Sequence, residues 1–313
     1  MLVTKIRTAF APCSLGAWPT PLEAHPGLAR ALGLDALWLK REDRAGGNKV
    51  RGLEFLFAGV PPGSVFVTIG GSGSTHCLVT ARLATQQGHR TAVALFPQPE
   101  TDTSRAFAAA IAANASLVAR ASSMFSFPWA VLRAWRAARS LSHRAPRWIS
   151  GGGAHPRAVL GHLLAMLEVG AQLDAPAPPD AFVVPLGTGG TAAGIALGVA
   201  WLGWSTEVVA VRVAPRVVAN RWRTLRLARR AVAALRRADI EFHVPQSSVR
   251  LRVADAMGRG YGYPTAEGER ARSLAAEHGV RLDPTYGAKA FGFLLRGERQ
   301  IHRVIFWHTF PSF

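Results

Sequence analysis

AFVVPLGTGGTAAGIALGVAWLG, residues 181–203, is the segment that decides the class of fold. Its first six residues are apolar enough for a buried strand, and the glycines that follow predict a sharp turn. The apolar segment after the turn has the length of a helix. A strand, a glycine turn and a helix in direct succession are typical of α/β proteins with parallel sheets.

The same succession recurs elsewhere in the chain. GSVFVTIGG (63–71) predicts a strand that ends at glycines, THCLVTARLATQQG (75–88) a helix, and RTAVALF (90–96) a further strand. TEVVAVRV (206–213) and ALWLKRED (36–43) predict two more strands. Because 313 residues are enough for two lobes, we expect a mainly parallel sheet flanked by helices in each.

Composition excludes several classes of protein. Hydrophobic residues make up 49% of the chain, which excludes a disordered protein. No apolar stretch reaches the roughly 18 residues of a membrane span, and the N-terminus lacks the apolar core of a signal peptide. Cys13 and Cys77 have no metal-type or redox-type spacing, so we expect a cytoplasmic protein. The ten histidines show no metal-binding motif, so no metal is expected.

The net charge of +18 raises the alternative of a nucleic-acid-binding protein. The most basic segment, residues 220–239, predicts an amphipathic helix. Its apolar face consists of Leu225, Ala228, Val232 and Leu235, and its solvated face carries Arg223, Arg226, Arg230 and Arg237. No recognised nucleic-acid-binding motif accompanies this helix, so a nucleic-acid partner is not expected, although salt-dependent retention on DNA or RNA would support one.

The turn after residue 186 has three interpretations. It is a structural turn, a dinucleotide-binding fingerprint or a cradle for one phosphate group, in which backbone N–H groups and a helix N-terminus face the anion. The dinucleotide interpretation requires an acidic residue after the next strand, where Arg212 and Arg216 stand instead. A single phosphomonoester fits best, and its candidate ligands are Gly187, Thr188, Gly189, Gly190 and Thr191.

A second glycine turn, TIGGSGSTHC (68–77), places Ser74, Thr75 and His76 at the start of a helix. Their donors could face a ligand above the sheet. The alternative is that Ser74 caps the helix and binds no ligand. A serine hydrolase is disfavoured because the Gly-x-Ser-x-Gly spacing is absent.

Lys49 follows two glycines in REDRAGGNKVRGLEFL (41–56), and the only other lysines are Lys5, Lys40 and Lys289. Lys49 is a surface lysine, a phosphate ligand or an amine that attacks an aldehyde, and a helix N-terminus and an apolar pocket both favour the neutral amine that the last role needs. One phosphate cradle and one candidate amine together point to pyridoxal phosphate.

Five segments carry a family resemblance, in chain order: KREDRAGGNKVRGLEF (40–55), IGGSGSTHCLVTA (69–81), VPLGTGGTAAGI (184–195), YGYPTAEGERARSLAAEHGVRLDPTYGAKA (261–290) and VIFWHT (304–309). The chain resembles the D-cysteine desulfhydrase and 1-aminocyclopropane-1-carboxylate (ACC) deaminase family over about residues 15–309. These are pyridoxal-phosphate enzymes of fold type II, the fold of the tryptophan synthase β subunit.

The resemblance implies roles for single residues. Lys49, beside Asn48, carries the cofactor as a Schiff base, and residues 187–191 hold its phosphate. Ser74 and Tyr286 are the catalytic acid–base candidates, and Thr75, His76 and Thr309 contact the cofactor. Because the hydroxyl of Thr309 cannot hold the pyridine nitrogen protonated as a carboxylate would, the ring favours elimination over transamination.

Several residues depart from the family pattern. Thr75 replaces an asparagine that bonds the cofactor's ring oxygen, and Gly52 stands where many members carry a lysine near the phosphate. Gly287 stands where ACC deaminases have a glutamate and desulfhydrases usually a threonine. The end reads His-Thr-Phe-Pro (308–311) instead of His-Thr-Gly-Gly. His76 and Thr309 favour the desulfhydrase branch.

The expected protein is a lyase that removes the α-proton of a small amino acid and eliminates its β-substituent, releasing a keto acid and ammonia. The alternatives are an ACC-deaminase-like deaminase, a racemase and a non-catalytic binding protein of the same fold. We expect a large cofactor-binding domain from residues 1–52 and 151–313, a small domain from residues 53–150, and a homodimer.

Overall fold

The computed structural model describes residues 1–245, 248–298 and 300–309, and divides the chain into two compact units. The large unit comprises residues 1–55 and 155–313, and the small unit residues 56–154. The sequence predicts these divisions at residues 52/53 and 150/151. The departure at Phe310 and Pro311 lies outside the described residues.

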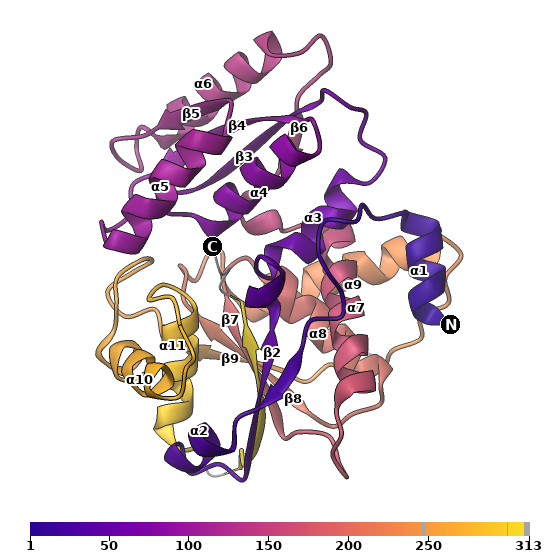
Figure 1. The fold of residues 1–313 in the computed structure, drawn as a ribbon. Helices are drawn as coiled ribbons and strands as arrows, with labels where there is room; N and C mark the ends of the chain where they lie inside the picture. Colours follow the sequence, from indigo (N-terminus) through magenta and orange to yellow (C-terminus); the bar gives the residue numbers. More distant parts are fainter. Residues whose placement is uncertain (246–247, 299, 310–313) are drawn as a thin grey trace. The chain divides into compact units, whose positions relative to one another are not determined.

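The described part of the large unit contains a six-stranded sheet in the order β1-β2-β10-β7-β8-β9 (Figure 1). All neighbours are parallel except β1 and β2. The strands are β1 Leu22–Ala24, β2 Ala36–Arg41, β7 Ala181–Leu186, β8 Glu207–Arg212, β9 Leu251–Asp255 and β10 Arg303–His308. This is the mainly parallel sheet that the succession of strands and helices predicts.

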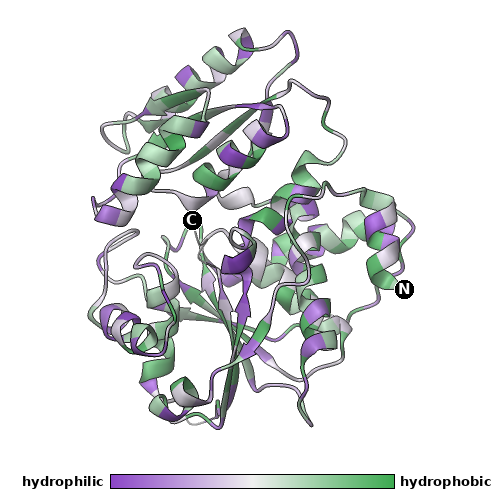
Figure 2. Cartoon of the chain, viewed as in Figure 1, coloured by the Kyte–Doolittle hydropathy of each residue, from purple (hydrophilic) through white to green (hydrophobic). Residues whose placement is uncertain are grey.

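Helices cover both faces of this sheet, because its strands carry buried apolar side chains on each face. Figure 2 colours the residues of these strands and helices by hydropathy. One core lies between the sheet and α2, α10 and α11, and the other between the sheet and α7 and α8. The helices are α1 Leu2–Phe10, α2 Pro26–Ala31, α3 Lys49–Phe57, α7 Pro156–Gln172, α8 Gly190–Trp201, α9 Arg221–Arg237, α10 Ala266–Glu277 and α11 Gly287–Gly292, with short 3-10 turns η1 Glu42–Ala45 and η4 Phe293–Arg296.

Glycines let the helices near β7 approach one another closely. A Cβ on Gly194 of α8 would lie 2.4 Å from the Cβ of His162 on α7, and one on Gly161 would lie 2.2 Å from the carbonyl oxygen of Arg51. Only glycine fits at these contacts. They fix the N-terminal parts of α3 and α8 against the same helix, α7.

A buried ionic network lies where α3, α7 and β2 meet. The Arg51 guanidinium bonds Glu42 at 2.6 Å and Glu168 at 2.7 Å, and the Lys40 amine bonds Glu168 at 3.1 Å. The aromatic ring of Trp18 stacks 3.8 Å from the Arg51 guanidinium. Buried charges of this kind are tolerated because each one has a partner of opposite sign.

The small unit has a parallel sheet in the order β5-β4-β3-β6. Its strands are β3 Val65–Gly71, β4 Arg90–Phe96, β5 Leu117–Arg120 and β6 Arg147–Ile149, and its helices are α4 Thr75–Gln86, α5 Asp102–Asn114 and α6 Phe127–Ser140, with the turn η2 Gly151–Gly153. Apolar cores pack on both sides of β4, and one of them also includes β3.

Each sheet has a point where the strand order reverses. In the large unit the chain moves from β7 outward to β8 and β9, and β10 lies on the other side of β7. In the small unit it moves from β3 outward to β4 and β5, and β6 lies on the other side of β3. Ligands of open α/β sheets bind at such reversals, next to the carboxyl ends of the strands. The two glycine turns follow β7 and β3, at these points.

The basic segment forms α9, as the amphipathic pattern predicts. Ala228 and Leu235 are buried, whereas Arg223, Arg230 and Arg237 are exposed. None of the helices within the described ranges is both long and apolar enough to cross a membrane.

Candidate active site

Lys49 is the first residue of α3 and follows a turn that needs glycine. Gly46 and Gly47 have φ angles of 81° and 92°, in the left-handed region that residues with a Cβ rarely adopt. Burial lowers the pKa of the Lys49 ammonium from 10.5 to about 8. Nowhere in the described part of the chain does a side chain or carbonyl bond this amine. It is therefore partly neutral near pH 8 and ready to react.

The other three lysines have different surroundings. The Lys40 amine is buried and bonds Glu168, the amide oxygen of Gln172 and the carbonyl of Thr20. Lys289 donates to the carbonyl oxygens of Met257 and Gly260 at 2.7 and 3.0 Å. Lys5 is exposed on α1. Of the four amines, that of Lys49 is both sheltered and without a partner among the described residues.

The glycine turn after β7 opens α8 with free backbone donors. Among the described residues, no side chain caps the α8 N-terminus. Gly189 has φ of 90°, and a Cβ there would lie 2.6 Å from the Thr224 hydroxyl oxygen, so only glycine fits. A Cβ on Gly190 would meet nothing within 4 Å. The described residues therefore leave open space beside Gly190, at the positive end of the α8 helix dipole, which favours an anion.

Asn48 connects Lys49 to this turn. Its side-chain amide donates to the hydroxyl oxygen of Thr191 at 2.8 Å, and its backbone N–H donates to the carbonyl of Thr309 at 3.4 Å. Both Asn48 and Thr191 are buried. The starts of α3 and α8 and the end of β10 are thus held together, as the sequence-based assignment of Asn48, Lys49, Thr191 and Thr309 to one site requires.

His162 also belongs to this region, and the sequence analysis did not single it out. Its Nε2 lies 3.5 Å from the Thr191 hydroxyl oxygen, and its ring is fully buried in α7. Burial, together with the positive charges of Lys49 and Arg51, holds the pKa of His162 well below its usual value. A histidine within the apolar stretch VLGHLLAML (159–167) gives no sign of its partner 29 residues away.

Tyr286 lies beside the glycine turn. A Cβ on Gly187 would lie 3.5 Å from a ring carbon of Tyr286, and the Tyr286 hydroxyl lies 2.7 Å from that of Tyr261. The Asp283 carboxylate accepts the backbone N–H groups of Thr285, Tyr286 and Gly287 and so fixes the turn that carries the tyrosine. Tyr261 is a further residue that the sequence-based assignment of the site omits.

Thr309 follows β10, and the side chain of the preceding residue, His308, contacts a carboxylate. His308 Nδ1 lies 3.2 Å from an oxygen of Asp43, and its Nε2 lies 2.9 Å from the Arg281 carbonyl. The Asp43 carboxylate is therefore already paired with His308. The Thr309 hydroxyl lies on a buried residue at the end of the strand.

In the small unit, Ser74 caps α4. Its hydroxyl oxygen accepts the backbone N–H of Cys77 at 3.3 Å, and a Cβ on Gly70 would lie 2.5 Å from that oxygen. His76 is buried, with Nε2 2.9 Å from the Thr68 hydroxyl and Nδ1 3.5 Å from the Thr80 hydroxyl. Thr75 is the first helical residue. The geometry shows the capping role of Ser74, whereas ligand roles for these three residues stay predictions.

A family model described as "Pyridoxal-phosphate dependent enzyme" matches residues 13–309. The chain belongs to this family of pyridoxal-phosphate dependent enzymes. A protein of Pyrococcus furiosus named "Putative 1-aminocyclopropane-1-carboxylate deaminase" is 29% identical over 324 residues, which cover 98% of this chain and 94% of the relative.

Solved structures show the same fold. An ACC deaminase homologue superposes with a TM-score of 0.78 at 27% identity, covering 97% of this chain and 94% of that one. The processed form of threonine deaminase isoform 2 from Solanum lycopersicum (TM-score 0.66, 16% identity, 100% and 90% coverage) and a serine racemase of Dictyostelium discoideum (0.66, 13%, 100% and 99%) share the fold alone. The chain therefore has fold type II, and the dinucleotide interpretation of the glycine turn is wrong.

The cofactor of this pyridoxal-phosphate family fits the residues present. The uncapped α8 N-terminus and the open space at Gly190 suit a phosphate group, and the unpartnered Lys49 amine suits its aldehyde. Gly52 stands where many relatives carry a lysine. A Cβ at this position would lie 3.0 Å from the Cβ of Ala158, so the site has little space for a side chain. A phosphate group at the turn after β7 would therefore face the N-terminus of α8 without that cation.

Proposed function

We propose that this pyridoxal-phosphate enzyme is a lyase of the D-cysteine desulfhydrase type. It would remove the α-proton of a small amino acid and eliminate the β-substituent, with release of a keto acid and ammonia. The observation that carries the proposal is the sheltered Lys49 amine, one residue away from an asparagine that bonds the phosphate turn. Bound pyridoxal phosphate supplies an electron sink for charge that develops on the substrate's α-carbon.

The protein's own groups have distinct tasks in this reaction. The N–H groups of residues 189–191 hold the phosphate, and the Asn48 amide fixes the Thr191 hydroxyl beside them. Because the pKa of Lys49 is lowered to about 8, its neutral amine would be available to hold the cofactor through its aldehyde and to accept a proton at Nζ. The Tyr286 hydroxyl, which is hydrogen-bonded to that of Tyr261, is proposed to accept or donate a proton at its own oxygen. Ser74 is proposed as a second proton-transfer group.

The choice of elimination rests on Thr309. If the cofactor binds as the family resemblance implies, the Thr309 hydroxyl would face the pyridine nitrogen and would not hold it protonated, so the ring would withdraw electrons less strongly than beside a carboxylate. The nearby carboxylate, Asp43, is engaged by His308 and Arg41. A weaker electron sink favours departure of a β-substituent over complete transfer of the amino group.

An ACC-deaminase-like activity is the second candidate, because the P. furiosus relative bears that name. Gly287 argues against it. ACC deaminases carry a glutamate at this position, yet a Cβ on Gly287 would lie 2.9 Å from the Asp283 carboxylate oxygen, and its N–H donates to the same oxygen. The turn is built for glycine.

A substrate panel tests the proposal. Purified holoenzyme is incubated with D- and L-cysteine, their β-chloroalanine analogues, D- and L-serine, and ACC, and keto acid, ammonia and sulfide are measured. The proposal predicts sulfide and pyruvate from a cysteine enantiomer and none from a Lys49→Ala control. Ketobutyrate from ACC alone, inversion of the α-carbon without keto acid, or no turnover of any compound would contradict it.

We also propose a homodimer as the assembly. Light scattering after size exclusion should then give about twice the 33.5 kDa of one chain, whereas a single-chain mass would refute this.

A further inference from the structure

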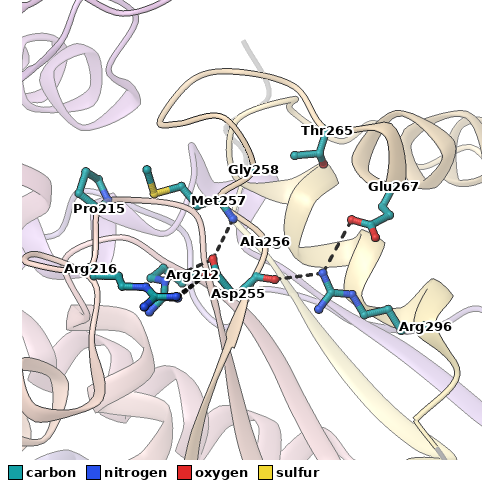
Figure 3. A pocket seen from close by; sticks show the side chains of 10 residues that line it. All are labelled: Arg212, Pro215, Arg216, Asp255, Ala256, Met257, Gly258, Thr265, Glu267 and Arg296. Atoms are coloured by element: carbon teal, nitrogen blue, oxygen red, sulfur yellow. Dashed lines mark hydrogen bonds and ion pairs between the residues drawn. The ribbon is translucent and has the colours of Figure 1, made fainter.

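A second pocket of about 540 Å³ lies at the carboxyl ends of β8 and β9 (Figure 3). Its walls come from the ends of these strands, the residues after them, the start of α10 and the η4 turn. Volumes of this size are typical of small-molecule sites. The pocket shares no lining residue with the Lys49 turn or with the phosphate turn after β7.

The lining is rich in arginine. Arg212, Arg216 and Arg296 face two carboxylates, Asp255 and Glu267, which leaves one positive charge in excess. Figure 3 shows Arg212 and Arg216 on one side of Asp255 and Arg296 on the other. Guanidinium groups that approach from two sides suit a tetrahedral anion, because its oxygens point in different directions.

The three arginines differ in how firmly they are held. Arg212 is largely buried and pairs with Asp255 through two of its nitrogens. Arg216 is 79% exposed and reaches the same carboxylate at 3.4 Å. Arg296 lies 3.8 Å from Glu267 and donates a 3.0 Å hydrogen bond to the main-chain carbonyl of Asp255. Long contacts of exposed groups contribute little free energy. The Arg216 guanidinium can therefore turn to a ligand at low cost. The Arg296 guanidinium has further donors besides the one that bonds the Asp255 carbonyl, and these can face a ligand while Arg212 and Asp255 keep the pocket wall in place.

We propose that this pocket binds a small phosphomonoester dianion through Arg216 and Arg296. The pocket is distinct from the cofactor's phosphate turn, so both anions can be bound at the same time. The nearest purely structural interpretation is a surface hollow in a strongly basic protein, in which any arginine attracts anions equally. If binding is specific to the pocket, only substitution of a pocket arginine weakens it. If attraction is generic, substitution of any exposed arginine weakens it equally.

Calorimetric titration of the holoenzyme with glycerol 2-phosphate distinguishes specific binding at the pocket from generic attraction to the basic surface. The bound cofactor fills the other phosphate site, and glycerol serves as the uncharged control. Arg216→Ala and Arg296→Ala each remove one charge at the pocket. Arg237→Ala removes the same charge from an exposed position at the far end of α9, about 24 Å along the helix from Arg221.

The proposal predicts saturable binding of glycerol 2-phosphate and none of glycerol. The two pocket variants should bind about tenfold or more weakly, which corresponds to the loss of one charge-assisted hydrogen bond, and Arg237→Ala should bind as the wild type does. No saturable binding, or equal weakening in all three variants, would overturn the proposal. Since the readout is binding, the result does not depend on which reaction the enzyme catalyses.

Discussion

The side-chain amide of Asn48 donates a 2.8 Å hydrogen bond to the hydroxyl of Thr191, 143 residues further along the chain. It joins the residue directly before α3, which begins at Lys49, to the first turn of α8, where we propose that the phosphate group of the cofactor binds. Since both side chains are buried, the bond has no water to replace it. The distance from the reactive amine to the phosphate turn is fixed by this contact.

Asn48→Ala should therefore weaken cofactor binding and lower the free energy of unfolding by about 1–3 kcal/mol, because the Thr191 hydroxyl loses a buried donor. Cofactor titration and urea denaturation measure the two effects. Asn114→Ala is the matched control, since the Asn114 amide donates to the carbonyl of Ala110 at the same distance on a helix of the small unit. Equal losses in both variants would contradict a special role for Asn48.

Lys49→Met should stabilise the cofactor-free protein at pH 7. Burial lowers the pKa of Lys49 to about 8, so the folded chain binds its proton less tightly than the unfolded chain does. The penalty is fully present below pH 8 and disappears as the pH rises toward 10.5, because the wild type gains stability over that range. After allowance for partial exposure, the advantage of the variant at pH 7 is about 1–2 kcal/mol.

Chemical denaturation of the two cofactor-free proteins at pH 7 and pH 9.5 checks this expectation. The advantage of Lys49→Met should shrink at the higher pH. An advantage that stays constant between the two pH values would show that packing, and not the charge of the amine, causes it.

Glu168→Ala should be severely destabilising. The carboxylate is the shared partner of Arg51 and Lys40, both of which are almost completely buried. Removing it leaves the buried Lys40 ammonium without an ion-pair partner, and Arg51 keeps only Glu42, so the network carries one uncompensated positive charge. The expected loss is about 3–5 kcal/mol. Glu269→Ala, which breaks an exposed pair with Arg272, should cost less than about 1 kcal/mol. Urea denaturation compares them, and similar losses would refute the account of the network.

Tyr286→Phe should lower kcat by about 100-fold or more, because it removes the hydroxyl that we propose as a proton carrier, while leaving the ring beside Gly187 in place. The chain has three tyrosines, and Tyr263, which is exposed, provides the control. Steady-state rates on the substrate found by the panel decide the question. A Tyr286→Phe enzyme as fast as Tyr263→Phe would exclude the proton-transfer role.

Local sequence patterns were sufficient to predict the alternation of strands and helices. The strand, glycine turn and helix over residues 181–201 are visible in the sequence because each element obeys its own periodicity. The placement of β10 beside β2 and β7 has no such local signal, since it depends on contacts between the two ends of the chain. For the same reason, the sequence predicts the glycine turns but not the point at which the strand order reverses.

The site divides in the same way. Lys49 and residues 187–191 are recognisable because glycine must precede or surround them. His162 and Tyr261 are not, since their importance comes from partners 29 and 25 residues away. The Arg51–Glu168 pair spans 117 residues and likewise leaves no pattern in either segment. Tertiary contacts of this kind become apparent only when the helices are packed.

Reductive trapping of the cofactor tests the central claim most directly. Borohydride treatment of the holoenzyme, followed by digestion and peptide mass spectrometry, identifies the lysine that is joined to the cofactor. The account predicts a phosphopyridoxyl group on Lys49 and none on Lys5, Lys40 or Lys289. Modification of Lys40 or Lys289, or a holoenzyme with no modified lysine, would contradict it.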